Sequence, residues 1–347
     1  MQPAKAGSQL VQALPLPGPD FDALTAPAAE LDKYGLPPRP NPKAQPQLYD
    51  AWRRMFAPPV TFVAPKLVQA QFGPTLVVQP EPAALVSGET RFDTSANWCG
   101  TYVQPFAGRM FVEMHGEWTL PTLSLPPPID QVPPGGPLPY KCSAWIGLDG
   151  QRRYLNSSLP QIGVEQTLTV AANGTQTPAA AAWFQWWARD ETTVNLFYWS
   201  GLAMQPGDQI RAHIHVVGLN MVHAHLRNQT TGQIAGITAT PPAVQLPNGG
   251  PLVQPSIAGA TAEWIMERPT VLGQTTLFPF PQYTPTVFSH CLAQQAAGPG
   301  QPGVTHVLKG ARFIRMYEVR ETPSRTAFIS MPTKLNDSEI RVRYGGF

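Results

Sequence analysis

The sequence is poor in charged residues and contains no run of basic residues. Asp, Glu, Lys and Arg make up 13% of the 347 residues, which is about half of the usual share in soluble proteins. Lys and Arg number 24 against 22 Asp and Glu, so the net charge is only +2. Without a basic patch there is no electrostatic basis for binding nucleic acid, and we expect no nucleic-acid partner.

Long apolar runs are also missing. The sequence has no apolar stretch of the roughly 18 residues that a membrane-spanning helix needs, so we expect no membrane partner. The first thirty residues show no basic start followed by an apolar segment, so no signal peptide is visible. These features leave the localisation open.

Cysteine is scarce. Cys99, Cys142 and Cys291 are odd in number and therefore cannot all pair within one chain. Their spacing is not typical of a zinc site either. We expect small buried thiols, with one disulfide and one free thiol as the open alternative.

Proline and tryptophan are abundant instead. Pro accounts for 41 of the 347 residues, against an average of about 5%. Because Pro disrupts helix interiors and central strands, this favours short strands joined by Pro-rich loops. Hydrophobic residues make up 43% of the chain and include nine Trp. That content is sufficient for a large core and excludes a disordered chain.

The first 90 residues differ from the rest. They are rich in Pro, Ala and Gln, and the segment Leu36–Pro42 is typical of polyproline or irregular chain. We expect no core of its own in this region. Residues 1–90 are therefore interpreted as an extension, either a pro-segment or a clasp, and residues 91–347 as the folded domain.

One helix is predicted within the extension, over Pro46–Phe56. Leu48, Trp52 and Met55 follow helical spacing there. Pro46 suits the first turn of a helix, where a missing N–H costs nothing.

Strand patterns follow one another from residue 97 onward. They cover residues 111–118, 143–148, 209–217, 262–266, 312–319 and 340–344. In residues 209–217 apolar residues alternate with polar ones, so that one face of the strand is apolar. Strands at this density predict an all-β fold, a sandwich or a barrel.

Two of the strand-like segments carry an amide side chain in their middle. Gln161 lies within Leu159–Glu165, and Gln185 lies within Trp183–Trp187. An amide that is buried or lines a cleft must find hydrogen-bond partners. Two amides on neighbouring strands would form a site that grips an extended polypeptide. With a carboxylate at one of these positions, the pair would form a hydrolase.

Seven short segments, in their order along the chain, resemble one known family. They are Asn97–Gly100, Gly116–Pro121, Trp145–Gly150, Gln161–Val164, Pro206–Asp208, Asn228–Gln233 and Ala262–Glu267. Together they resemble the glutamic peptidases, or eqolisins (peptidase family G1 or A4), over residues 92–347. The resemblance implies a bent antiparallel β-sandwich of two large sheets, similar to a concanavalin or jelly-roll fold. It also implies a substrate cleft on the concave face.

The resemblance further implies a catalytic pair. Members of this family are acid endopeptidases in which a Glu acts as general base and a Gln donates to the oxyanion. Gln161 matches the family Gln, whereas the position of the family Glu is occupied by Gln185. A neutral amide cannot take a proton from water, so the resemblance implies an intact cleft with impaired catalysis. The exchange is either natural, marking a pseudoenzyme, or engineered.

Further residues are candidates for contacting the substrate: Trp98, Trp145, Asp149, Glu165, Trp183 and Trp187. Glu165 shares a strand face with Gln161, and orienting that Gln is its simpler role. Asp149 matches a family Asp, although an Asp-Gly turn also explains it. The remaining acidic residues near these strands are expected in solvent: Glu113, Glu117, Asp190 and Glu191.

Four histidines form two His-x-His pairs across a predicted hairpin: His213, His215, His223 and His225. The alternation of the strands directs all four away from the core. Cross-strand Cβ distances of about 4.5–5.5 Å would allow them to bind a metal. An exposed polar strand face is the favoured interpretation, so we expect no metal and no cofactor.

Three functions are compatible with these features. The first is a glutamic-type acid endopeptidase-like protein with impaired peptide-bond hydrolysis and a polypeptide as its partner. The second is a β-sandwich that binds a polypeptide or glycan without cutting it. The third is a structural or assembly protein, which low charge and high Pro content favour. The resembled family is largely secreted.

Overall fold

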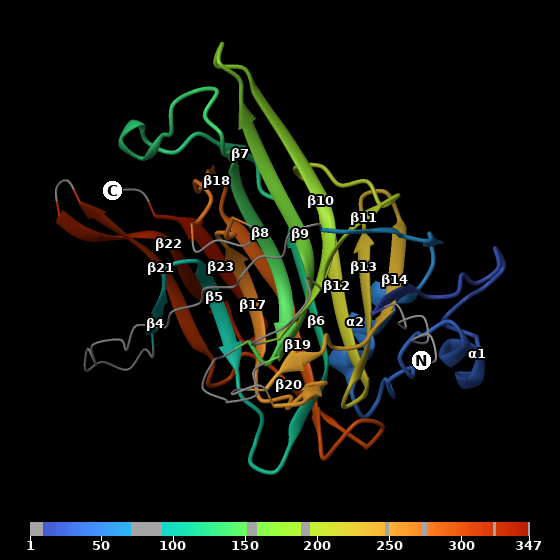
Figure 1. Ribbon diagram of the computed structural model, residues 1–347. Helices are drawn as coiled ribbons and strands as arrows, with labels where there is room; N and C mark the ends of the chain where they lie inside the picture. Colours follow the sequence, from blue (N-terminus) through green and yellow to red (C-terminus); the bar gives the residue numbers. More distant parts are fainter. Residues whose placement is uncertain are drawn as a thin grey trace, which may run out of the picture.

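The computed structural model describes residues 10–70, 92–150, 158–188, 195–246, 250–271, 276–321 and 324–345. Long antiparallel strands form two large layers, and two short helices lie on the outside of one layer (Figure 1). This confirms the predicted β-sandwich.

The front sheet is the layer that contains both amide-bearing strands. In spatial order its strands are β3 (Lys66–Gln69), β11 (Leu196–Ser200), β10 (Gln176–Ala188), β9 (Ser158–Val170), β8 (Tyr140–Leu148), β17 (Ala262–Glu267), β5 (Trp98–Val103), β21 (Arg312–Glu321), β22 (Ser324–Asn336) and β23 (Glu339–Tyr344). A short strand, β4 (Phe92–Ser95), runs parallel to β21.

The back sheet contains the histidine hairpin. Its order is β1 (Val11–Ala13), β14 (Gln233–Ala239), β13 (Met221–Asn228), β12 (Gln209–Gly218), β6 (Met110–Thr119), β19 (Thr286–Ala296) and β20 (Val304–His306). The extension adds a second strand here, because β2 (Thr61–Phe62) pairs parallel with β14.

One strand belongs to both layers. The first residues of β19 pair with β23 of the front sheet, and the residues from Ser289 onward pair with β6 of the back sheet. His290 has a φ of 48° at this transition, where the pairing is irregular. The change of partner within one strand joins the two sheets along one edge of the sandwich.

The remaining elements are short. They are α1 (Ala28–Lys33), α2 (Pro46–Phe56), a 3₁₀ turn (Pro128–Asp130), the pair β7 (Leu123–Ser124) and β18 (Gln282–Tyr283), and the pair β15 (Val244–Gln245) and β16 (Leu252–Val253). Within the described ranges, no helix has the length and apolar character needed to cross a membrane.

The main core lies between the two sheets. Ile210, Ala212 and Ile214 of β12 are all buried in it, as the alternation of this strand predicts. Ile162 of β9 and Phe184 of β10 enter the same core from the front sheet. Because side chains alternate along a strand, the residues between them point to the outer faces of the sandwich. The outer faces therefore carry the polar residues of interest.

The extension covers the outer face of the back sheet, beside β12 to β14 (Figure 1). Helix α2 has the bounds predicted from the sequence. Apolar residues of the extension pack together against the back sheet. A small apolar cluster joins its residues to Ile234 of β14: Ala23, Ala26, Leu31, Leu36, Trp52, Met55 and Phe56. These residues are too scattered in sequence to form a periodic pattern, and the sheet brings them together.

A buried arginine fixes the end of α2 to the back sheet. Nη1 of Arg227 donates to the carbonyl oxygens of Arg54, Met55 and Ala57, at 3.0, 3.1 and 3.1 Å. The last carbonyls of a helix have no partner within the helix, so a cation placed there satisfies them and complements the helix dipole. Arg227 therefore ties the extension to the domain through polar contacts as well as apolar ones.

The three cysteines are free and buried. This agrees with the expected buried thiols and removes the alternative of a disulfide among them. Burial raises the pKa of Cys99 to about 12, so its thiol stays protonated.

Replacing Trp52 with Ala is expected to destabilise the docked extension by about 3–5 kcal/mol, the usual cost of deleting a large buried aromatic side chain. Trp52 is fully buried and donates from Nε1 to the carbonyl of Pro37 at 3.1 Å. Urea unfolding, combined with hydrogen exchange of the α2 amides, measures the effect.

The matched control is Arg53→Ala on the same helix. The Arg53 side chain is 52% exposed and pairs with Asp50, so its loss is expected to cost about 1 kcal/mol or less. Equal effects of the two variants would contradict the described docking of α2.

Candidate functional site

Gln161 and Gln185 face each other across β9 and β10. They are direct partners in the antiparallel pairing of these strands. Nε2 of Gln161 donates to Oε1 of Gln185 at 3.1 Å, and both side chains are buried. Their apolar neighbours Ile162 and Phe184 point into the core, so the alternation directs both amides to the outer face of the front sheet. The structure thus brings the two amides together.

Each amide keeps one polar atom without a partner. Oε1 of Gln161 and Nε2 of Gln185 are buried and make no hydrogen bond to any described residue. Most buried polar atoms in proteins are paired. The pair therefore offers one unused acceptor and one unused donor side by side, which is the combination that a peptide group of a ligand can satisfy.

Two glycines make room for this arrangement. A Cβ on Gly163 would lie 2.3 Å from the carbonyl oxygen of Ala144 and 2.5 Å from Cβ of Trp145. A Cβ on Gly147, which pairs with Gln161, would lie 3.1 Å from Cβ of that Gln. Side chains at either position would force β8 and β9 apart, so the glycines of these segments serve close packing.

A pocket of about 90 Å³ opens beside the amide pair. Its lining residues come from β8 to β11, from the end of β17 and from the segment that follows it: Lys141, Ser143, Glu165, Trp183, Gln185, Leu196, Tyr198, Glu267, Pro269, Thr270 and Phe278. The volume holds a few water molecules or one side chain. The pocket therefore has the size of a site for a single side chain.

Glu165 is held in the wall of this pocket. Its Oε1 accepts from Nζ of Lys141 at 2.7 Å, and its Oε2 accepts from the hydroxyl of Tyr198 at 3.3 Å. Burial and the charge of Glu165 raise the pKa of Tyr198, so the hydroxyl stays a donor. The other two carboxylates considered near this strand, Asp190 and Glu191, fall outside the described residues.

Glu267 is a pocket residue that the sequence analysis missed. Trp145 donates from Nε1 to its Oε2 at 2.7 Å, and Asn97 donates to its Oε1 at 3.3 Å. Burial raises the pKa of Glu267 to about 7, helped by the charge of Glu165 and opposed by these hydrogen bonds. Glu267 ends one of the seven recognised segments. Its partners lie 122 and 170 residues away, so only the fold reveals its role.

The four candidate tryptophans divide into two groups. Trp183 lines the pocket and donates from Nε1 to Oγ of Ser143 at 2.9 Å. Trp98 and Trp145 pack edge to face, with ring centroids 5.0 Å apart, and are almost completely buried. Trp187 belongs to the same apolar cluster, but it is not among the residues that line the pocket. Trp183 alone of the four reaches the pocket wall.

Asp149 lies apart from the pocket lining. Its carboxylate accepts from the backbone N–H groups of Ala258, Gly259 and Ala260, at 2.7, 3.1 and 2.6 Å. Burial raises its pKa to about 6 even though these hydrogen bonds oppose the shift. Its φ of 68° fits the Asp-Gly turn considered from the sequence. Through these hydrogen bonds Asp149 anchors the segment before β17.

The histidine hairpin is paired as the alternation predicts, but it is not exposed. His213 lies opposite His225, and His215 lies opposite His223, on the outer face of the back sheet. His213 and His225 are nevertheless buried, because Phe56 of α2 packs edge to face against both rings, at 5.4 and 5.1 Å. The expected exposed polar face is therefore wrong, since the extension covers it.

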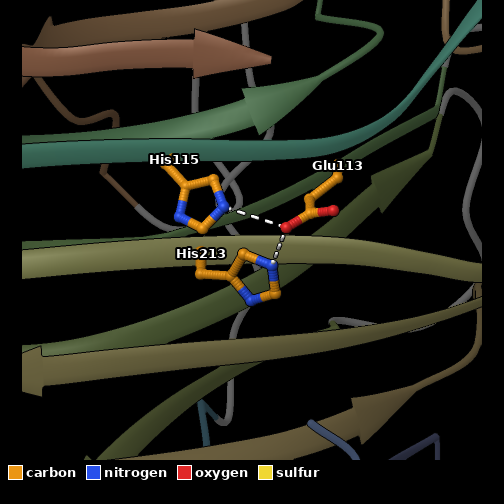
Figure 2. Close-up of side chains that lie close together, drawn as sticks. All are labelled: Glu113, His115 and His213. Carbon is orange, nitrogen blue, oxygen red and sulfur yellow. Dashed lines mark hydrogen bonds and ion pairs between the residues drawn. The ribbon is translucent and has the colours of Figure 1, made fainter. Parts of the chain in front are cut away.

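Glu113 and His115 of β6 lie beside His213 (Figure 2). Oε1 of Glu113 lies 2.9 Å from Nε2 of His115 and 3.1 Å from Nε2 of His213. Glu113 was expected in solvent, yet it is only 3% exposed. Burial lowers the pKa of His213 to about 3 despite the nearby carboxylate, so this imidazole is neutral at ordinary pH.

Glu117, the other acidic residue of β6, is also less exposed than expected. Its side chain is 16% exposed and forms ion pairs with Arg211 at 3.0 Å and with Arg54 at 3.7 Å. Arg54 belongs to α2, so the docked extension is again the reason for the difference. A sequence pattern on β6 alone could not indicate this cover.

Comparison with known proteins places the chain in a family. The model of the peptidase A4 family matches residues 96–344. The fold is similar to that of scytalidoglutamic peptidase, which was solved with a transition-state-analogue inhibitor. The two sequences are 18% identical, and the match covers 72% of this chain and 98% of that chain with a TM-score of 0.51. None of the curated proteins compared with the chain matches it.

Two further solved structures are also similar. One is SCP-B, a member of the eqolisin family in complex with the tripeptide Ala-Ile-His, at 17% identity, with 72% of this chain and 98% of that chain covered and a TM-score of 0.48. The other is aspergilloglutamic peptidase from Aspergillus niger, at 20% identity, with 59% and 99% covered and a TM-score of 0.43. Because the family model spans well over half of the chain and includes both amide-bearing strands, the chain belongs to the peptidase A4 family, the glutamic peptidases or eqolisins.

Proposed function

We propose that this chain is a glutamic-peptidase-like protein that grips an extended polypeptide on the outer face of its front sheet, and that its hydrolytic activity is impaired. The observation that carries this proposal is the buried Gln161–Gln185 pair beside a pocket. The pair stands at the positions that the family resemblance assigns to the catalytic Gln and Glu.

The unused atoms of the two amides support binding of a polypeptide backbone. A peptide group carries one N–H donor and one carbonyl acceptor. Oε1 of Gln161 can accept from such an N–H, and Nε2 of Gln185 can donate to such a carbonyl. The adjoining pocket, with Trp183 in its wall, then accommodates one side chain of the bound segment.

The chemistry of the amide supports impaired hydrolysis. A general base is typically worth about 10²–10⁴-fold in rate, and Gln185 cannot supply it. The carboxylate of Glu165 is engaged by Lys141 and Tyr198. Glu267, with its pKa near 7, is protonated at acidic pH and cannot accept a proton there.

Replacing Gln185 with Glu is expected to raise peptidase activity at acidic pH by about 10²–10⁴-fold. The change keeps the oxygen that accepts from Gln161 and converts the unpartnered Nε2 into a carboxylate oxygen aimed into the same space. Cleavage of denatured casein at acidic pH, followed by mass spectrometry of the fragments, measures the gain.

The control for this gain is the double variant Gln161→Ala with Gln185→Glu, which restores the base but lacks the amide that donates to the oxyanion. We expect it to fall well below the single variant. Equal activity of Gln185→Glu and the unmodified chain would contradict the proposed role of position 185.

The pKa of Glu267 predicts how stability depends on pH. Folding raises this pKa from an ordinary value of 4.5 to about 7. Between these values the folded state binds more protons than the unfolded state, so stability contributed by this group falls as pH rises. Relative to Glu267→Gln, which does not titrate, the unmodified chain should lose stability from about pH 4.5 to about pH 7. Urea unfolding at several pH values measures this, and parallel curves for the two proteins would contradict it.

A further inference from the structure

A second polar cluster lies on the back sheet, on the opposite side of the sandwich from the amide pair. We propose that Glu113, His115 and His213 bind a divalent transition-metal ion, with Zn²⁺ as the best match, beneath the docked extension. The three side chains come from adjacent strands, β6 and β12, and point toward one another (Figure 2). The inference does not depend on the proposed function of the amide pair.

The distances within the cluster fit a metal site. Oε1 of Glu113 lies 2.9 and 3.1 Å from the two Nε2 atoms, and one ligand atom from each of the three residues lies within 4.8 Å of the others. Ligands at about 2.0–2.2 Å from a tetrahedral Zn²⁺ are separated by about 3.3–3.6 Å. Room for an ion requires the two oxygen–nitrogen distances to widen by a few tenths of an ångström and the histidine nitrogens, within 4.8 Å of each other, to take the same spacing.

The donor set determines which class of ion is favoured. Two imidazole nitrogens and one carboxylate oxygen are ligands of zinc and of other late first-row metals. Mg²⁺ and Ca²⁺ prefer sites made of oxygen atoms. The cluster consequently discriminates in favour of Zn²⁺ and its neighbours in the periodic table.

A second layer of contacts orients the ligands. Nδ1 of His213 lies 3.3 Å from Nδ1 of His225. With a metal on Nε2, His213 carries its proton on Nδ1 and donates it to Nδ1 of His225; such a hydrogen bond from the second ring nitrogen fixes the tautomer and orientation of a metal-bound histidine. Gly236 leaves room for His225, since a Cβ there would lie 2.6 Å from Cδ2 of that ring. Phe56 packs edge-on against both rings.

Binding at this site needs a change of tautomer and no oxidation or reduction. In the metal-free hydrogen-bonded arrangement, Nε2 of His115 and Nε2 of His213 each donate to Glu113. When the ion takes the place of these two protons, His115 and His213 each carry their single proton on Nδ1, and His225, which accepts from His213, carries its own proton on Nε2. The carboxylate remains ionised, so the ion is held by one negative charge and two neutral nitrogens.

His215 lies at the edge of the cluster, next to a cavity. Nδ1 of His215 lies 4.0 Å from Oε2 of Glu113, and it makes no hydrogen bond to any described residue. Glu113 and His215 also line a cavity of about 830 Å³ bounded by Pro38–Asn41, Ala44–Leu48 and Gly300–Thr305. An ion can reach the cluster from this cavity, and His215 or a water molecule completes its coordination.

The test uses the full chain, freed of metal with a chelator and then titrated with Zn²⁺ in a calorimeter. We expect one tight site per chain. Glu113→Gln and His213→Asn should each lose at least about 100-fold in affinity, because even partners outside the first ligands cost 10–100-fold when removed. Circular dichroism establishes that each variant is folded.

The matched control is His290→Asn. His290 lies near Asp50 and Glu117, at 3.6 Å from each, and not near Glu113. Asn tolerates its positive φ, so this variant should bind Zn²⁺ like the unmodified chain. Equal affinity in all three variants would overturn the proposal, as would the absence of tight binding to the unmodified chain.

X-ray absorption on the unmodified, Zn²⁺-loaded chain provides a measurement that needs no variant. We expect imidazole nitrogens and a carboxylate oxygen around the ion. A spectrum with water oxygens alone would identify the cluster as a hydrogen-bonded network without a metal and would overturn the assignment.

Discussion

The pairing of β9 with β10 is the constraint on which the candidate site depends. This register sets Gln161 opposite Gln185 and sends both amides to the outer face, while Ile162 and Phe184 fill the core. A slip of one residue would reverse every side chain of a strand, burying an amide in the core and exposing an aromatic ring. Burial of Ile162 and Phe184 in the core therefore fixes the position of the amide pair on the opposite face of the sheet.

The two outer faces of the sandwich differ in what lies against them. On the front sheet, the amide pair lies beside a pocket, and the carboxyls nearby are either engaged by Lys141 or raised in pKa by burial. On the back sheet, the extension covers part of the polar face with α2, and Phe56 packs against His213. The same alternation of side chains thus places the proposed binding site on one side. On the other side it produces a buried cluster of imidazoles around Glu113.

The sequence predicted what depends on local patterns. Helical spacing predicted α2, and alternation predicted the strands and the hairpin that places the four histidines on one outer face. It failed where distant segments meet. The cover over His213 comes from Phe56, and its partner Glu113 lies 100 residues away in the chain. The role of Glu267 likewise depends on remote partners, so only the assembled sheets reveal these contacts.

The most direct test of the central claim is a crystal structure of the unmodified chain with an extended peptide bound. We expect an intact peptide along the outer face of β9 and β10, accepting a hydrogen bond from Nε2 of Gln185 and donating one to Oε1 of Gln161. A peptide bound elsewhere on the molecule, or amides turned into the core between the sheets, would contradict it.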